Sequence, residues 1–361
     1  MEHTLVEDSA KTKVTPPKFK VSKGFAGWLK KAGGSLVFSA RRLNKVYTVG
    51  LDANDEVAFF ERTYPEPMGL HVQGTTLLLA DKFRIWRFEN AVKPNTQHPF
   101  DGFDGIFVAE TMFRTGLQDI HDIGFLKNGM IAFASSRMNC VGGTSSSYGI
   151  VPLWKPYFIK DLKYEDHCHL NGLAIEDGTV KYITALSDTD TFEGWRNVRA
   201  DGGILMDVKS GEIVLDGLSM PHAPRLHKGD LWLINSGTGE IGKVDFKKKA
   251  FIPKVTISGF ARGLSFVNDS GIICSSKLRE SVSFQDLPLE NKLKKEKTED
   301  QCGLYVFDVK TGKIEHSIVS DNDTLEEIFD VVFVPGVKRI MLSGFYDQLS
   351  EQMITVAPVL Q

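Results

Sequence analysis

The stretch with the most residues able to do chemistry is 165–174, with the sequence EDHCHLNGLA. It holds two of the nine histidines and one of the four cysteines, directly before an apolar run. Imidazole and thiol groups bind transition metals and transfer protons. In a strand, His167 and His169 would share one side and Cys168 would face the other. We rank His169 above His167, because it is closer to the start of the apolar run, and interpret Cys168 as a buried apolar residue.

The same kind of strand entrance recurs along the chain, at residues 67–70, 120–123, 220–223, 261–264 and 328–331. A small residue then ends a second apolar run, at Ser39, Ala80, Ser135, Ser187, Ser236, Ser276 and Ser343. In four of these units the entrance residue and the small residue are 13 positions apart. Turn sequences such as 308–313 join further apolar runs, as in antiparallel hairpins.

These repeats predict an all-β protein with a single β-propeller domain, built from four antiparallel strands every 40–65 residues or so. Seven second-strand endings favour seven blades. The entrance near residues 25–27 is poor, however, and six blades with a strand shared between the termini is the alternative. We predict a flexible tail over residues 1–22, because this part is polar and has no strand period, and the propeller over residues 23–361.

Because the innermost strand of each blade lines the channel, residues at the entrances should converge on one axis. Those positions are Met68, His121, Asn171, His222, Arg262 and Phe329, followed by Gly69, Asp122, Gly172, Ala223, Gly263 and Asp330. The candidate catalytic residues are His121, Asp122, His169, Asn171 and His222. Three imidazoles, from His121, His169 and His222, suit one zinc, iron or manganese ion with an open coordination position. A metal-free acid–base site, or a structural role in plugging the channel, would use the same residues.

Basic residues gather near the same predicted face, although the formal net charge of the chain is −3. We assign a small anionic ligand to Arg137, Trp195, Arg196, Arg225, Arg262, Lys277 and Asp330. Arginine binds carboxylate or phosphate through two hydrogen bonds. The competing interpretation is that these arginines pair with acidic residues and only anchor loops. Three insertions, at residues 138–148, 188–201 and 282–301, should hang over this face.

Composition and motifs exclude several classes of protein. The near-neutral charge does not favour nucleic-acid binding. The segment 236–240, SGTGE, lacks the Gly-Lys-Ser/Thr of a phosphate loop, so we expect no nucleotide cofactor. The four cysteines are dispersed, and neither a signal peptide nor an apolar stretch of 18 residues is present. We therefore expect a cytoplasmic protein without a membrane span.

Several strings resemble one bacterial family of hypothetical proteins that carry a domain of unknown function. They are HLNGLA (169–174), DGGILMDV (201–208), GLSMPHAPRLHKGDLWLINSGTGE (217–240), GFARGLSF (259–266) and EEIFDV (326–331). The resemblance runs from about residue 25 to residue 345 and implies no activity. A looser resemblance, of fold only, is to propeller lactonases and strictosidine-synthase-like enzymes. Those lactonases hold calcium with Glu, Asn and Asp, whereas this chain has His, Asn, His and Arg at the axis.

Two function classes follow. In the first, the protein is a propeller enzyme that acts on a small anionic molecule at the histidine-rich axis, with lyase, isomerase or hydrolase chemistry. In the second, it is a non-catalytic platform that binds a protein or peptide partner.

Overall fold

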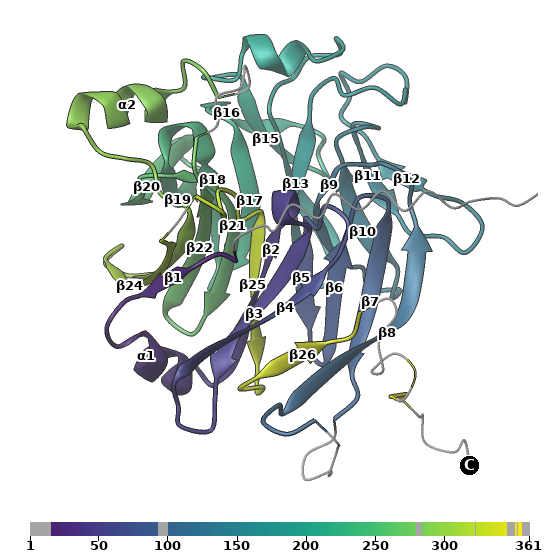
Figure 1. The fold of residues 1–361 in the computed structure, drawn as a ribbon. Coiled ribbons are helices and arrows are strands. Elements are labelled where there is room, and N and C mark those ends of the chain that lie inside the picture. The colour runs from purple at the N-terminus through teal and green to yellow at the C-terminus, as the bar shows by residue number, and fades with distance from the viewer. Residues whose placement is uncertain are drawn as a thin grey trace, which may run out of the picture.

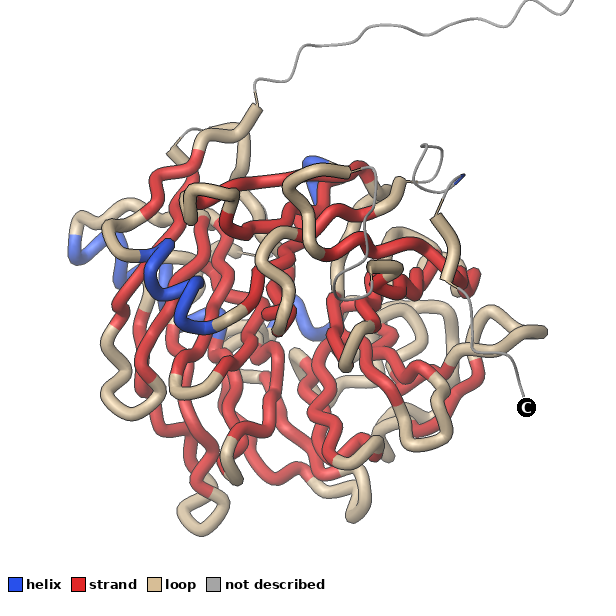
Figure 2. Tube along the Cα trace, turned by 90° about the horizontal axis from the view of Figure 1, so that it is seen from below, coloured by secondary structure: helices blue, strands red, loops and turns tan. Residues whose placement is uncertain are grey.

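The computed structural model describes residues 16–92, 100–278, 284–321, 323–344, 351 and 353–355. Six antiparallel sheets surround one channel and form a six-bladed β-propeller (Figures 1 and 2). From the channel outward, three blades are β5 (Leu70–Gln73), β6 (Thr76–Ala80), β7 (Arg84–Asn90) and β8 (Gly105–Arg114); β9 (Ile120–Phe125), β10 (Ile131–Ser135), β11 (Cys140–Gly143) and β12 (Val151–Trp154); and β13 (Leu170–Glu176), β14 (Thr179–Ala185), β15 (Gly203–Asp207) and β16 (Ile213–Leu218).

The next two blades are β17 (Pro221–His227), β18 (Asp230–Asn235), β19 (Glu240–Asp245) and β20 (Ala250–Thr256); and β21 (Phe260–Val267), β22 (Ser270–Ser276), β23 (Gly303–Asp308) and β24 (Ile314–Ser320). The sixth combines both ends of the chain, as β25 (Asp330–Pro335), β2 (Gly34–Ala40), β3 (Lys45–Leu51) and β4 (Val57–Thr63). Helical segments are short, namely α1 (Phe25–Ala32), α2 (Pro288–Glu296), η1 (Arg41–Leu43), η2 (Gly194–Asn197) and η3 (Ser236–Thr238).

The sixth blade closes the ring. Its inner strand β25 pairs antiparallel with β2, in a register from Gly34 opposite Pro335 to Ser39 opposite Asp330. Because this pairing joins residues about 300 positions apart, the ring closes only when both ends of the chain are in place. Two further strands extend neighbouring sheets: β1 (Phe19–Val21) pairs with β24, and β26 (Ile340–Leu342) pairs parallel with β8.

The all-β propeller prediction is confirmed, but the preference for seven blades was wrong. The seventh ending, Ser343, follows β26, which is an outer edge strand of the β5–β8 blade rather than the second strand of a blade. The poor entrance near residues 25–27 is the start of α1. The six good entrances each lead into an inner strand, so six is the number they give.

The strands follow from their sequences. The second strands β2, β6 and β10 are buried along their whole length, with the sequences GSLVFSA, TLLLA and IAFAS, because another blade covers each of their faces. Close approach of neighbouring inner strands requires Gly172, where a Cβ atom would lie 2.4 Å from Cδ of Pro224. The blades therefore pack tightly at the channel, and side chains at the strand entrances have fixed positions.

The insertions differ from the prediction in one case. Residues 188–201 and 284–301 each follow a second strand and lie at the end of the channel where the inner strands begin; α2 belongs to the latter and lies at the top of Figure 1, opposite α1. Residues 138–148 contain β11, which leads away from that end, so 144–148 connect strands at the opposite end. Residues 1–15 of the predicted tail lie outside the described residues, and Phe19–Val21 forms β1.

Candidate functional site

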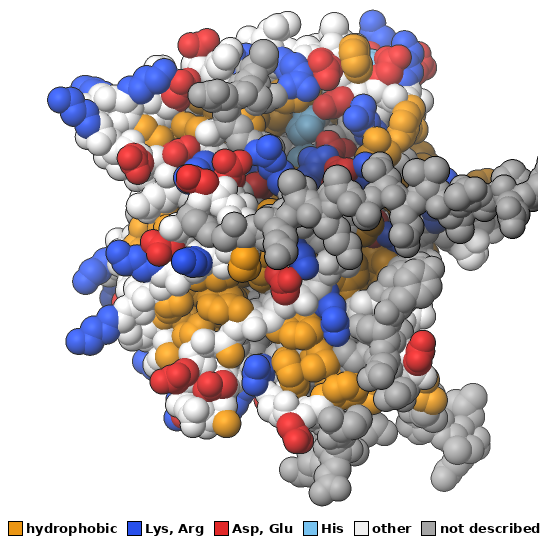
Figure 3. All heavy atoms as spheres, in the orientation of Figure 1, with side chains coloured by type: hydrophobic (Ala, Val, Ile, Leu, Met, Phe, Trp, Pro, Cys, Tyr) orange, Lys and Arg blue, Asp and Glu red, His pale blue; other side chains and the backbone are white. Residues whose placement is uncertain are grey.

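A cavity of about 190 Å³ opens at the end of the channel where the inner strands begin. Its polar lining comes from Arg41, Asp119, His121, Arg137, Asp166, His169, Glu193, Arg196, His222 and Arg262. Its apolar lining comes from Leu186, Trp195, Met220, Phe260, Phe284 and Phe329. In Figure 3 a histidine side chain is visible in the upper part of the molecule, with basic and acidic side chains around it. Residues from all three sequence-predicted histidine entrances thus meet in one cavity.

A repeated backbone feature determines which side chains reach the cavity. Glu66, Asp119, His169 and Met220 have positive φ angles, of 43°, 53°, 54° and 48°. Each lies two residues before an axial residue of the next inner strand. Residues other than glycine rarely adopt this left-handed conformation, which costs about 1–3 kcal/mol. Asp119 and His169 therefore occupy equivalent positions in neighbouring blades, above the axial positions His121 and Asn171.

The same turns fix the protonation of two histidines. Nδ1 of His121 lies 2.8 Å from the carbonyl oxygen of Asp119, and Nδ1 of His222 lies 2.8 Å from that of Met220. A carbonyl oxygen can only accept, so Nδ1 carries the hydrogen in both rings. Ser236 Oγ, 2.9 Å from Nδ1 of His222, is a second partner. In the neutral rings, Nε2 therefore has the lone pair that a metal ion or a proton would use.

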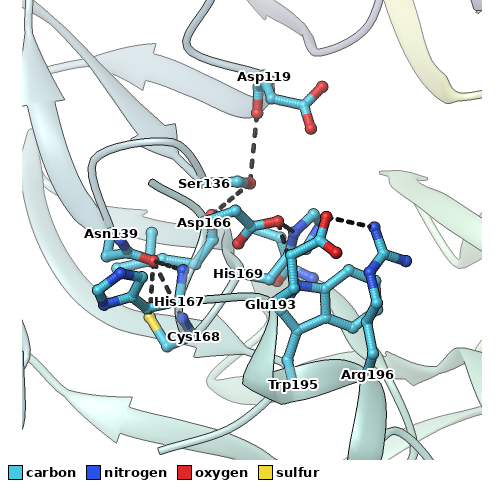
Figure 4. Close-up of polar contacts among 12 residues, drawn as sticks. Asp119, Ser136, Asn139, Asp166, His167, Cys168, His169, Glu193, Trp195 and Arg196 are labelled. Atoms are coloured by element: carbon cyan, nitrogen blue, oxygen red, sulfur yellow. Dashed lines mark hydrogen bonds and ion pairs between the residues drawn. The ribbon is translucent and has the colours of Figure 1, made fainter. Parts of the chain in front are cut away.

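His169 has the same tautomer for a different reason. Its Nδ1 lies 2.7 Å from Oδ2 of Asp166, which also accepts a hydrogen bond of 3.1 Å from Nε1 of Trp195 (Figure 4). The Trp195 and His169 rings have centroids 4.7 Å apart. Carboxylates that orient an imidazole in this way commonly support metal-bound histidines. Asp166 and Trp195 together hold Nε2 of His169 in position.

Asp119, His121 and His169 form a group whose potential ligand atoms all lie within 4.8 Å of one another. Two nitrogen ligands and one carboxylate suit zinc or another divalent transition metal. Oδ1 of Asp119 is buried without a hydrogen bond, although Nη2 of Arg41 lies 3.3 Å away. The sequence predicted His222 as the third ligand; the structure brings Asp119 into this group instead. The His222 ring lies 6.0 Å from that of His121, centroid to centroid.

Burial and neighbouring charges determine the ionisation of these groups. Burial lowers the pKa of His121 to about 4, with a further contribution from His169. Burial also lowers the pKa of His222 well below its usual value, and the His121 and Arg262 charges add to this effect. For Asp119 burial acts to raise the pKa, but the His121 and Arg41 charges outweigh it and the pKa is lowered. At neutral pH the site thus presents neutral imidazoles beside an ionised carboxylate, as metal binding requires.

Four of the predicted site residues lie one layer deeper in the channel. Arg225 forms two hydrogen bonds with Asp122, of 2.6 Å and 3.1 Å, and Asn171 donates to the carbonyl oxygen of Pro221. Asp330 accepts hydrogen bonds from the backbone of Leu70 and Val331. A second cavity of about 10 Å³, large enough for one water molecule, lies between these residues and the histidines. These contacts close the channel, and within them Arg225 behaves as the loop-anchoring interpretation expects.

The other predicted basic residues have different surroundings. Arg262 lines the cavity, lies 5.1 Å and 5.3 Å from the Phe260 and Phe329 ring centroids, and pairs with Glu327 at 2.6 Å. Arg196 stacks over Trp195 and pairs with Glu193. Lys277 pairs with Asp323 and lines a separate hollow beside α2. Among the described residues the guanidinium of Arg137 has no hydrogen bond or ion pair, and it lines the axial cavity.

Sequence reasoning missed Arg41, Asp119, Asp166 and Glu193. The signal for Asp119 was present, because it lies two residues before His121 as His169 lies two before Asn171. Asp166 lies three residues before His169, within the segment 165–174 that the sequence singled out. Nothing in a single sequence connects Arg41 or Glu193 to this cavity, because both reach it from loops of other blades.

Residues 23–342 match the family described as a domain of unknown function, DUF4915. The chain belongs to this family. A search of curated proteins found no match. Among the described residues, no helix is long and apolar enough to cross a membrane.

Solved structures similar to the chain include several propellers. A chain of a nidogen/laminin complex aligns with a TM-score of 0.51 at 10% identity, covering 84% of this chain and 99% of the other. Virginiamycin B lyase from Staphylococcus aureus aligns with a TM-score of 0.40 at 16% identity, covering 67% and 74%. A luciferin-regenerating enzyme aligns with a TM-score of 0.42 at 10% identity, covering 90% and 100%. At these identities the similarity concerns the fold alone.

Proposed function

We propose that the axial cavity is the active site of an enzyme that acts on a small anionic molecule. In this proposal Asp119, His121 and His169 hold a divalent transition metal, and His222 transfers a proton. The observation that carries it is the orientation of the three imidazoles, whose Nδ1 atoms are all engaged by fixed acceptors in one cavity. A channel plug needs no such common orientation, since either ring nitrogen can satisfy a carbonyl group.

The residues around the cavity have separable roles under this proposal. The metal, when bound, would polarise an oxygen of the substrate or of a water molecule. Nε2 of His222 is neutral and accepts a proton from the substrate, then returns it. Arg137 and Arg262 bind the anionic group, and Trp195 and the phenylalanines exclude bulk water. Lyase, isomerase and hydrolase reactions all use proton transfer beside a polarised group.

The test measures metal binding directly. Protein stripped with a chelator is titrated with Zn²⁺, Mn²⁺ and Fe²⁺, the last without oxygen, by isothermal titration calorimetry. We expect about one ion per chain, and a loss of affinity of about tenfold or more in Asp119→Asn and His169→Ala. His227→Ala is the matched control, because His227 lies at the far end of β17, stacked on Phe266.

Cobalt provides a second measurement that does not depend on activity. Co²⁺ bound by two imidazoles and a carboxylate should give a visible absorption spectrum that the His169→Ala variant lacks. If none of the metals binds, or if Asp119→Asn and His169→Ala bind as tightly as His227→Ala, the metal assignment is wrong.

A protein-binding platform is the second candidate. Tyr157, Tyr164 and Phe192 are more than half exposed, on loops at the same end of the channel as the cavity. Aromatic side chains are enriched in protein interfaces. If this candidate is right, the protein binds no transition metal, and replacing the three residues by serine abolishes partner binding without changing the cavity.

A further inference from the structure

One carboxylate oxygen in the wall of the cavity has no donor. Asp166 is only 8% exposed, and its Oδ2 atom accepts hydrogen bonds from His169 and Trp195. Its Oδ1 atom is buried and has no hydrogen-bond partner among the described residues. Buried polar atoms are nearly always paired. A donor group on a ligand is therefore the natural complement of Oδ1.

Asp166 remains ionised in this position. Burial acts to raise its pKa, but the His169 charge and the hydrogen bonds from His169 and Trp195 lower it. Asp166 also lies outside the group of three potential metal ligands. Its free oxygen is thus a negatively charged acceptor that the proposed metal does not use, and a cationic donor is the best match for it.

Arg137 supplies the opposite charge in the same cavity. Arg41, Arg196 and Arg262 have carboxylate partners, whereas Arg137 has none among the described residues. Its charge is nonetheless felt by two acids of the cavity, since it contributes to the lowered pKa values of Asp119 and Glu193. Arg137 is therefore the cation that an anionic group can reach without first displacing a salt bridge.

The wall near these two charges is apolar. Leu186, Trp195, Met220, Phe260 and Phe284 pack in one hydrophobic cluster and also line the cavity. The cavity, at about 190 Å³, is smaller than the 300–1,000 Å³ or so that is usual for drug-sized ligands. It matches a metabolite with one apolar side chain.

We propose that the cavity binds a small zwitterion, namely an amino acid or amino-acid derivative with an apolar side chain. Its carboxylate contacts Arg137, its ammonium group donates to Oδ1 of Asp166, and its side chain packs against the apolar wall. This inference rests on the proposed function and names its substrate class. A simple carboxylate would leave Oδ1 of Asp166 buried without a donor, and a simple amine would leave Arg137 without an anion.

The test compares matched compounds. Leucine, methionine and phenylalanine are each titrated into the full-length protein, with and without Zn²⁺, together with the acid that lacks the amino group and the amine that lacks the carboxylate. A charge-assisted hydrogen bond changes affinity by about ten- to a hundredfold. We expect at least one amino acid to bind more tightly than both counterparts by this factor. If none of the three does, the proposal is overturned.

Two variants assign the contacts. Asp166→Asn should weaken the amino acid about ten- to a hundredfold and leave the deaminated acid unchanged, which also shows that the variant is folded. Arg137→Gln should weaken the amino acid and leave the amine unchanged. Asp269→Asn and Arg87→Gln are the matched controls, on exposed pairs with Lys228 and Glu89.

The outcomes separate the two proposals. If acids bind through Arg137 but the amino group adds nothing, the zwitterion is wrong and the anion-binding enzyme stands. If no compound binds and no metal is retained, both proposals are wrong.

Discussion

The ion pair between Asp122 and Arg225 should act on stability rather than on ligand binding. Oδ2 and Oδ1 of Asp122 lie 2.6 Å and 3.1 Å from the two terminal nitrogens of Arg225. Oδ2 also accepts the backbone N–H of Leu173. The pair therefore joins the inner strands β9, β13 and β17. Its side chains are 5% and 23% exposed, so removing one partner leaves a largely buried charge.

Breaking a buried pair by removing one partner costs about 3–5 kcal/mol. We expect Asp122→Asn to lower the free energy of unfolding by that amount, and the melting temperature by about 4–7 °C for a chain of this length. Urea denaturation followed by circular dichroism measures the change. Zn²⁺ affinity in the folded variant should remain that of the wild type, because Asp122 lies below the proposed ligands.

A double-mutant cycle sharpens this test. Asp122→Asn combined with Arg225→Gln removes both charges, so its loss of stability should be smaller than the sum of the two single losses. Asp269→Asn, on an exposed pair, should change stability by less than about 0.5 kcal/mol. An Asp122→Asn protein with wild-type stability but without metal or ligand binding would refute the reasoning and restore the catalytic role that the sequence suggested.

Three other predictions concern protons. Burial raises the pKa of Asp330 to about 7, so the folded protein keeps a proton that the unfolded chain loses near pH 4; its contribution to stability should fall as the pH rises from about 4 to 7, and Asp330→Asn should remove this slope from denaturation curves. For His167 burial acts to lower the pKa, but hydrogen bonds to Asp190 and Glu165 outweigh it and raise the pKa; the stability lost in His167→Gln should therefore be present below about pH 6.5 and disappear as the pH rises through the raised value. Nitrogen-15 NMR at neutral pH should find the hydrogen of His121 and His222 on Nδ1; a hydrogen on Nε2 of either would contradict the assignment made from their carbonyl partners.

The fold was largely predictable because the blade repeat is local. An entrance, a turn and a second strand lie within about 15 residues, so one sequence is enough to find them. The number of blades was not local. It depends on whether Ser343 ends a second strand and whether residues 25–27 begin a first one, and the answer lies in the pairing of β25 with β2 across the whole chain. Counting entrances gave the correct number, and counting second-strand endings did not.

The site was predictable to the extent that the repeat places residues on the axis. His121 and His222 are axial residues in equivalent positions, and they meet as expected. His169 and Asp119 reach the cavity because of positive φ angles, a backbone conformation that hydrophobic periodicity does not reveal. Salt-bridge partners were also not predictable, because the contacts of Arg225 with Asp122 and of Arg262 with Glu327 span 103 and 65 residues.

Charge balance explains why the two layers of the channel have different roles. In the deeper layer Arg225 faces Asp122 and Asp330, and the layer is neutral when Asp330 keeps its proton. Its hydrogen-bonding groups are used by the fold, so a substitution there changes stability. In the upper layer the Nε2 atoms of the histidines, Oδ1 of Asp166 and the guanidinium of Arg137 have no use in the fold that the described residues account for. Because unpaired buried polar groups destabilise a protein, these groups point to a ligand, and experiments on function should begin with them.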